Sequence, residues 1–300
     1  MSQTREFLGW VRANGQVGVR NHLLVLPSVV CATHTVREAA HEISDAVYFE
    51  HPIGCAQIGR DRDQTLRTLV GMGAHPNVRD TVVIGLGCEG VPAEEVYQGI
   101  IERHHPAQVI TIQAAGGSQK AAQKAIAALR SSPSNPTVRE AVAVDRLILG
   151  VGTINGWGTQ GHHLIEACLD RGLRVLEGTN SRPRVLPYGA PMLENVQYAA
   201  MEAPVGDSAL ITGLAASGAH LIIAQADAHH LGGHPIVPVM RLGYEEKQRP
   251  TLLDDIDGMW EDRTPDGWVD WILEVASGVA TMVEEMRTET FAIERIGPTL

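Results

Sequence analysis

The chain has 300 residues, of which 44% are hydrophobic and 20% charged, a composition typical of a soluble globular protein rather than a disordered one. A formal net charge of -11 and an aromatic content of 4% argue against a nucleic-acid surface and against stacking platforms for bases. The sequence has no apolar run of about 18 residues and no signal-peptide pattern at its start, so we expect a cytoplasmic protein that spans no membrane. Four cysteines are too few for a disulfide scaffold.

The first part of the chain alternates short β-branched runs with amphipathic helical patterns. Strands are predicted in the runs HLLVLPSVVC, AVYFEHPIGC, TVVIGLGCE and QVITIQ. Helices are predicted over residues 32–43, 60–71 and 93–103 and from residue 118 onward, where Gly116 and Gly117 precede the helix. This alternation predicts a doubly wound α/β unit over residues 1–130.

A second α/β unit is expected after a linker. The stretch SSPSNPT is typical of a linker, and we place the boundary at residues 131–144. Strands are then predicted at 146–152, in LRVLEG, at 219–224 and in IVPVMRL, with helices at 159–170, 192–201 and 208–217 and a long closing helix over 268–286. The predicted fold class is α/β, with two Rossmann-like doubly wound halves, mostly parallel sheets, and residues 145–300 as the second half.

Three of the four cysteines follow predicted strands. Cys31, Cys55 and Cys88 each come at or just beyond a strand's carboxyl end, where ligands of open α/β sheets bind. Thiolates select iron, zinc or copper(I), so a shared metal or cluster site is one interpretation. The alternative is three buried cysteines that act as small hydrophobic residues. Cys168 lies inside the pattern HHLIEACLDRG and is expected to pack in a helix.

Polar residues near the same strand ends are candidates for catalysis and for substrate binding. Glu89 and His51 are the acid or base candidates closest to the cysteines. The free N–H groups after Gly116 and Gly117 suit an anion, although a glycine pair is more often a tight turn. Candidate substrate-binding residues are Arg20, Asn21, Gln113, Gly116, Gly117 and Lys120. Arg20 could instead form an ordinary salt bridge.

A histidine-rich loop follows the strand predicted at 219–224. His229, His230 and His234 share this loop with Asp227 and a glycine pair, a composition suited to binding metal or moving protons. A polar surface loop is the alternative. We take His230 and His234 as further catalytic candidates.

Several of these motifs together resemble the altronate and galactarate dehydratase family. They are GWVRANGQVGVRNHLLVLPSVVCAT, HPIGCAQIGRDRDQTLRTLVGMGAHPNV, VVIGLGCEG and IQAAGGSQKA, in that order. The resemblance implies an iron-assisted dehydration of sugar acids, or elimination of sulfite as in a relative that acts on sulfolactate. It also implies a separate small β-rich domain or subunit. In the second half, GVGTINGW and ADAHHLGGH replace the family's Cys-Gly-Gly-Ser-Asp and Thr-Gly-Arg-Gly-Thr stretches and are predicted substrate-recognition loops.

The function expected from the resemblance is a metal-dependent hydro-lyase, a carbon–oxygen lyase that converts a small 2-hydroxy or sugar acid to a 2-keto acid. Elimination of sulfite or another anion, or a noncatalytic metabolite-binding subunit, are the alternatives. The expected cofactor is iron, as mononuclear Fe(II) or an iron–sulfur cluster held by Cys31, Cys55 and Cys88, with manganese or another divalent metal as alternatives. The expected partners are a small carboxylate substrate, a small β-rich subunit and further copies of the chain.

Overall fold

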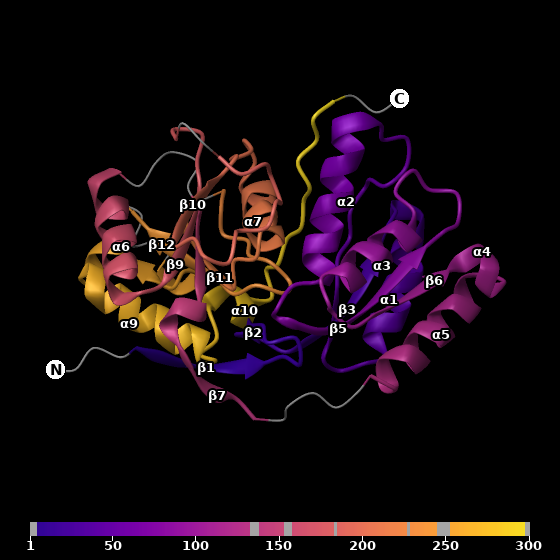
Figure 1. Cartoon of the computed structure of the whole chain (residues 1–300), viewed down its shortest axis with the longest axis horizontal. Coiled ribbons are helices and arrows are strands. Elements are labelled where there is room, and N and C mark those ends of the chain that lie inside the picture. The colour runs from indigo at the N-terminus through magenta and orange to yellow at the C-terminus, as the bar shows by residue number, and fades with distance from the viewer. Residues whose placement is uncertain are drawn as a thin grey trace.

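Four parallel strands form the centre of the first half in the computed structural model, which describes residues 5–132, 138–152, 158–182, 185–226, 229–244 and 253–297 (Figure 1). Their order in the sheet is β4, β3, β5, β6. The strands are β3 (His22–Pro27), β4 (Ala46–Tyr48), β5 (Val78–Gly85) and β6 (Ala107–Thr111). The helices that cover the sheet are α1 (Thr33–His41), α2 (Gly59–Gly73), α3 (Ala93–Glu102) and α5 (Ser118–Arg130).

Helices cover both faces of this sheet, and successive side chains of each strand point to opposite faces, so both sets are buried. Leu23 and Val25 of β3 pack in one cluster with α1 and α5. Leu24 and Leu26 point to the other face and pack with α2 and α3. The continuous apolar runs of the sequence therefore mark strands covered by helices on both sides, and the predicted doubly wound unit is confirmed.

The second half contains a six-stranded parallel sheet in the order β10, β9, β8, β11, β12, β13. The strands are β8 (Ile148–Gly152), β9 (Arg174–Gly178), β10 (Tyr198–Met201), β11 (Leu221–Ala226), β12 (Val239–Gly243) and β13 (Gly258–Met259). One face packs against α6 (Gly158–Arg171) and α9 (Pro265–Ala276), and the other against α7 (Asp207–Ala216). Across the described ranges, no helix has the length and apolar character needed to cross a bilayer.

A small antiparallel sheet joins the beginning of the chain to the region between the halves. Strand β1 (Glu6–Val11) pairs with β2 (Val17–Gly18) on one side and with β7 (Glu140–Ala143) on the other. Phe7 and Val17 pack into the core of the second half. The first residues therefore lie against the second half, and part of the predicted linker is a strand. Such pairing across more than 130 positions leaves no local pattern in the sequence.

Two predicted helices differ in the structure. The helix predicted over 192–201 is wrong, because its last four residues form β10, parallel to β9. The Met, Leu, Glu, Gln and Ala residues of this segment favour a helix locally, but pairing with β9 and burial of Met201 override that preference. The closing helix is divided into α9 and α10 (Met282–Met286). Gly278, with φ of +117°, ends the first of them, and Thr281 caps the second.

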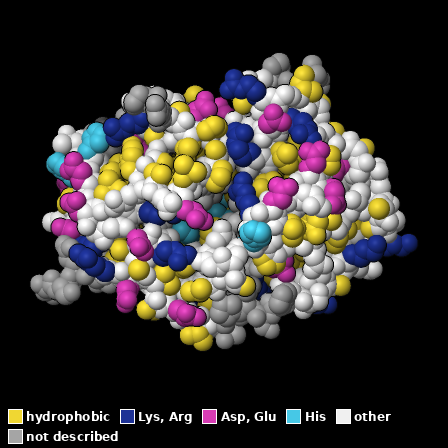
Figure 2. Space-filling model, viewed as in Figure 1, with side chains coloured by type: hydrophobic (Ala, Val, Ile, Leu, Met, Phe, Trp, Pro, Cys, Tyr) yellow, Lys and Arg dark blue, Asp and Glu magenta, His cyan; other side chains and the backbone are white. Residues whose placement is uncertain are grey.

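The two halves meet along α2, α7 and a C-terminal segment, residues 288–296, that we call the strap (Figure 1). Helices α2 and α7 approach closely at Gly71, where an added Cβ would lie 2.3 Å from the carbonyl oxygen of Ala216. Asn77 donates to the carbonyl oxygens of His220 and Ile236, at 2.8 and 2.9 Å. In the space-filling view, Lys and Arg side chains follow the boundary between the halves (Figure 2).

Buried histidines at this boundary should make the stability of the fold depend on pH below about 6.5. His75, His220 and His234 are buried, and burial lowers their pKa, to about 3 for His220 and His234. The unfolded chain takes up these protons near pH 6.5, so the contribution of these histidines to stability should be constant above that pH. It should fall as the pH drops below about 6.5, by up to about 1.4 kcal/mol per pH unit for each histidine.

Urea unfolding at pH 4.5 to 8 checks this expectation. His220→Gln keeps an acceptor for the Ile148 N–H, which bonds to Nδ1 of His220 at 2.8 Å, and should make the pH dependence shallower. His34→Gln, at an exposed position on α1, is the matched control and should leave it unchanged. An identical pH dependence in all three proteins would contradict the assignment.

Candidate functional site

Three cysteines lie at the carboxyl edge of the first sheet. Cys31 lies in the short helix η1 (Val30–Ala32) after β3, Cys55 follows β4, and Cys88 follows β5. These strands are neighbours in the sheet. All three thiols are exposed and none is in a disulfide. Cys168 is buried in α6, and burial raises its pKa to about 12, as expected for a packed cysteine.

The backbone joins the three cysteine loops into one structure, which we call the thiol rim (residues 28–32, 53–57 and 86–91). The Val30 N–H donates to the Ile53 carbonyl oxygen at 2.9 Å. The Gly54 carbonyl oxygen accepts from the N–H groups of Gly90 and Val91, at 2.9 and 3.1 Å. Gly54 has φ of +101°, and an added Cβ would lie 2.3 Å from the Ser28 carbonyl oxygen. Only glycine fits this crossing of the loops.

Glu89 closes the loop that carries Cys88. Its carboxylate accepts from the N–H groups of Gly87 and Cys88, at 2.5 and 2.9 Å, and from the Ser28 hydroxyl at 3.2 Å. Partial burial raises the pKa of Glu89, but these hydrogen bonds outweigh it and hold the pKa below its usual value. Glu89 is therefore ionised at neutral pH beside Cys88.

His51 lies beneath the thiol rim. Its Nε2 donates to the Pro27 carbonyl oxygen at 2.9 Å, and its Nδ1 accepts from the Ile53 N–H at 3.4 Å. The ring is buried, and burial lowers its pKa. A general base needs a ring nitrogen that can take a proton, and both nitrogens of His51 are engaged with the backbone. The arrangement favours a structural role, which is to hold the loop before Cys55.

Arg20 and Asn21 lie at the opposite end of β3 from Cys31. Both precede the first residue of the strand, whereas Cys31 follows its last residue. Arg20 is buried and forms a two-pronged ion pair with Glu284, at 2.6 and 2.8 Å. Asn21 accepts a hydrogen bond from Arg12. These contacts favour a structural role for Arg20 and Asn21, and their position is wrong for the predicted binding of a carboxylate beside the cysteines.

The segment after β6 supplies groups to the same edge of the sheet. The Gln113 N–H donates to the Leu86 carbonyl oxygen at 3.1 Å, and a Cβ added at Gly87 would lie 2.7 Å from Oε1 of Gln113. Gly116 and Gly117 have φ of +85° and +117° and turn the chain into α5, whose first turn has no side-chain cap. Lys120 is exposed and lies beside Gly116. Four of the predicted substrate-binding residues therefore lie together, next to the Cys88 loop.

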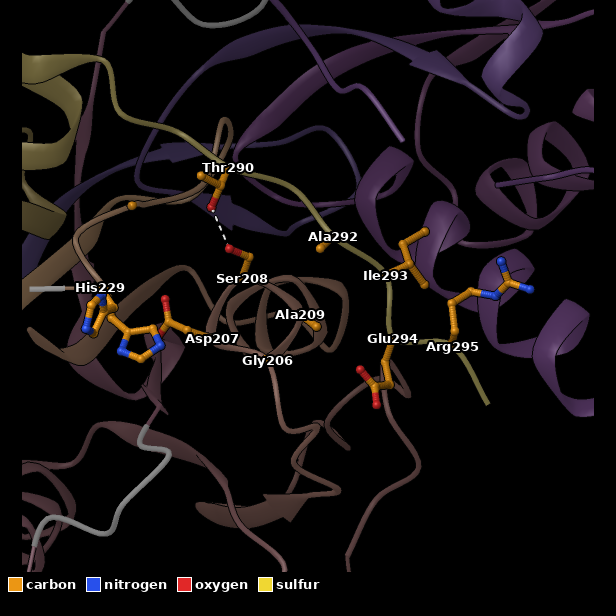
Figure 3. A pocket seen from close by; sticks show the side chains of 12 residues that line it. Gly206, Asp207, Ser208, Ala209, His229, Thr290, Ala292, Ile293, Glu294 and Arg295 are labelled. Carbon is orange, nitrogen blue, oxygen red and sulfur yellow. Dashed lines mark hydrogen bonds between the residues drawn. The ribbon is translucent and has the colours of Figure 1, made fainter. Parts of the chain in front are cut away.

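The predicted histidine loop is divided between two environments. His234 is buried beside the stacked rings of Phe49 and Phe291, at centroid distances of 5.6 and 5.8 Å, and its Nε2 has no hydrogen-bond partner among the described residues. His229 and His230 line a cavity of about 560 Å³ under the strap. The start of α7, with Ser208, forms the other wall of this cavity (Figure 3). Asp227 and residues 153–157 of the GVGTINGW stretch lie outside the described residues.

The donor chemistry of the thiol rim suits a soft metal or an iron–sulfur cluster. It offers three exposed thiols from loops that are fixed to one another. In the part of the chain that the structure describes, no three Cys, His, Asp or Glu side chains are grouped as metal ligands. The rim therefore matches the expected group in ligand type and in the loops that carry the thiols, but its three side chains are not drawn together as ligands in this structure.

Sequence reasoning missed the polar residues beneath the rim. Gln57 and Asp61 are buried, and Gln57 bonds to Asp61 and to Thr65, both at 2.8 Å. Ser28 is also buried and bonds to Glu89. Asp61 and Thr65 are four residues apart in α2, so they lie on one face of the helix, and that spacing was a usable signal. Gln57 lies in the loop before α2, where no such spacing applies.

Comparison with known proteins finds a match to one family in the first half. Residues 9–134 match the family described as D-galactarate dehydratase/Altronate hydrolase, second domain, and this range contains all three rim cysteines but not Cys168. The beta subunit of (2R)-sulfolactate sulfo-lyase from Chromohalobacter salexigens is 43% identical over 82 residues, which are 27% of this chain and 21% of that protein. Altronate dehydratase from Escherichia coli is 42% identical over 95 residues, 28% of this chain and 19% of the relative. Altronate dehydratase from Bacillus subtilis is 36% identical over 98 residues, which are 29% of this chain and 20% of that protein. The chain thus spans about a fifth of the length of the curated relatives it matches.

Proposed function

We propose that the chain is a lyase that removes water from a small 2-hydroxy or sugar acid, because residues 9–134 match the second domain of the D-galactarate dehydratase/altronate hydrolase family. The product is a 2-keto acid. The observation that carries the proposal is the thiol rim, because the matched segment supplies all three of its loops. The names of the relatives support elimination as the reaction class, with sulfite as the alternative leaving group.

Iron is the cofactor we propose, as mononuclear Fe(II) or as a cluster, held by Cys31, Cys55 and Cys88. When bound, it supplies Lewis-acid stabilisation of the negative charge that develops on the substrate. Three thiol ligands leave a coordination position for substrate or water, which suits this chemistry.

The other rim residues would bind the substrate and move its proton. The N–H groups after Gly117 and the ammonium group of Lys120 would hold the carboxylate, since an uncapped helix start and a cation both attract an anion. Gln113 would hydrogen-bond a hydroxyl. Glu89 would accept the α-proton, because its carboxylate lies beside Cys88.

The second half would select the substrate. His230 lines the cavity under the strap and is the histidine we propose to contact substrate hydroxyls, whereas buried His234 would support the loop by packing beside the stacked rings of Phe49 and Phe291. The match to a subunit of sulfolactate sulfo-lyase supports a separate partner polypeptide. A small β-rich subunit and self-association are parts of the same proposal.

A screen of 2-hydroxy and sugar acids for release of a keto acid tests the function. We expect turnover of at least one such acid, with altronate and galactarate as poor substrates, because the second-half loops differ from those of the sugar-acid enzymes. His230→Ala should lower kcat/KM by about tenfold or more, since a polar site group would be left unpaired.

His162→Ala, at an exposed position in α6, is the matched control for the loss of an imidazole. It should not change kcat/KM. Efficient turnover of altronate that His230→Ala does not affect would show that the histidine loop is outside the site. An absence of keto-acid release with every acid would contradict the lyase proposal itself.

A further inference from the structure

The strap connects the second half of the molecule to the first. On the second half, the N–H of Thr290 donates to the Gly233 carbonyl oxygen at 3.0 Å, and the N–H of Ala292 donates to the Thr212 hydroxyl at 3.3 Å. On the first half, Phe291 stacks on Phe49 at a centroid distance of 4.4 Å. Figure 3 shows the strap passing from Thr290, beside the histidine cavity, to Arg295, whose side chain points toward the first half.

At its far end, the strap binds the first turn of α2 through Asp61. Nε of Arg295 lies 3.2 and 3.1 Å from the two carboxylate oxygens of Asp61, and the Ile296 N–H donates to Asp61 at 3.0 Å. Burial raises the pKa of Asp61, but the hydrogen bonds from Ile296, Gln57 and Arg295 outweigh it and lower the pKa. The carboxylate is therefore ionised and held in place from the strap side.

Asp61 in turn fixes Gln57, which holds the backbone of the cysteine loop. Nε2 of Gln57 donates to Asp61 at 2.8 Å, and its Oε1 accepts from the Gly54 N–H at 3.0 Å. A flipped amide would lose both bonds, because the carboxylate can only accept and the N–H can only donate. The side chain of Gln57 thus has one orientation, and Asp61 determines it.

We propose that Arg295 is a positioning residue for Cys55 and acts through Asp61 and Gln57. Gly54 directly precedes Cys55, and its carbonyl oxygen also anchors the Cys88 loop at Gly90 and Val91. Holding the Gly54 N–H therefore sets the position of two of the three thiols. The catalytic consequence rests on the proposed lyase function, whereas the mechanical link does not.

The test compares Arg295→Ala, Arg295→Lys and Arg182→Ala in the full-length protein. Arg182 pairs with Glu177 at 3.3 Å in the second half and is the matched control. Amide hydrogen exchange of residues 53–57 should speed up by about tenfold or more in Arg295→Ala, the factor expected when one hydrogen bond to a charged group is lost. Exchange of β3 should not change.

Iron retention and kcat should fall in the same variant while KM stays within about twofold, because the carboxylate-binding groups after β6 are not affected. Arg295→Lys should restore most of both values, because an ammonium group can still pair with Asp61.

Unchanged exchange at residues 53–57 in Arg295→Ala, or an equal effect of Arg182→Ala, would overturn the inference. A wild-type protein that holds no iron and releases no keto acid would contradict the proposed function. The exchange measurement would still decide whether Arg295 positions the Cys55 loop.

Discussion

Replacing any one of Cys31, Cys55 and Cys88 by serine is expected to remove most of the bound iron and to lower lyase turnover by about a hundredfold or more. A serine hydroxyl is a harder donor that stays protonated at neutral pH, so it cannot replace a thiolate on a soft metal. Loss of Lewis-acid stabilisation of several kcal/mol accounts for the drop in rate. Iron per chain and keto-acid release, measured on anaerobically purified protein, check both parts.

Cys168→Ala is the matched control for this series. Cys168 is buried in α6 and packs with the second core, so its loss should lower stability modestly and leave iron content unchanged. Full iron retention in all three rim variants would contradict the metal site, and loss of iron in Cys168→Ala alone would place the site elsewhere.

The strands that carry the thiol rim could be predicted because burial on both faces leaves a local signal. β3 and β5 contain apolar runs at residues 23–27 and 82–85, and the carboxyl ends of neighbouring parallel strands must lie on one edge. The placement of Cys31 and Cys88 follows from those two facts. Strand β10 was missed because Tyr198–Met201 is only four residues long and has no β-branched residue, and its pairing with β9 makes it a strand.

The polar network around the rim could be predicted only where its members are close in sequence. Glu89 is next to Cys88, and its proximity was evident. The link from Gln57 through Asp61 to Arg295 joins positions more than 230 residues apart, and neither residue composition nor spacing indicates such a contact. The ion pair of Arg20 with Glu284 also joins positions far apart in the sequence. For that reason a buried structural arginine was interpreted as one that binds a carboxylate substrate.

Arg20→Ala should destabilise the fold by about 3 kcal/mol or more, the cost of breaking a buried ion pair by removing one partner. The guanidinium donates to both oxygens of Glu284 and to the carbonyl oxygens of Val275 and Val279. Burial raises the pKa of Glu284, but the hydrogen bonds and charge of Arg20 hold it below its usual value, so the variant would leave a buried carboxylate without its counter-charge. Urea unfolding at pH 7 measures the loss.

Arg37→Ala is the matched control, because Arg37 pairs with Glu50 at 3.0 Å on the surface and should contribute less than about 1 kcal/mol. The folded fraction of Arg20→Ala should keep its iron and its KM, since Arg20 lies at the opposite end of β3 from Cys31. A variant with normal stability and a strongly raised KM would reverse this assignment and return Arg20 to the substrate site. Stability and KM therefore separate the two roles of this arginine in one pair of measurements.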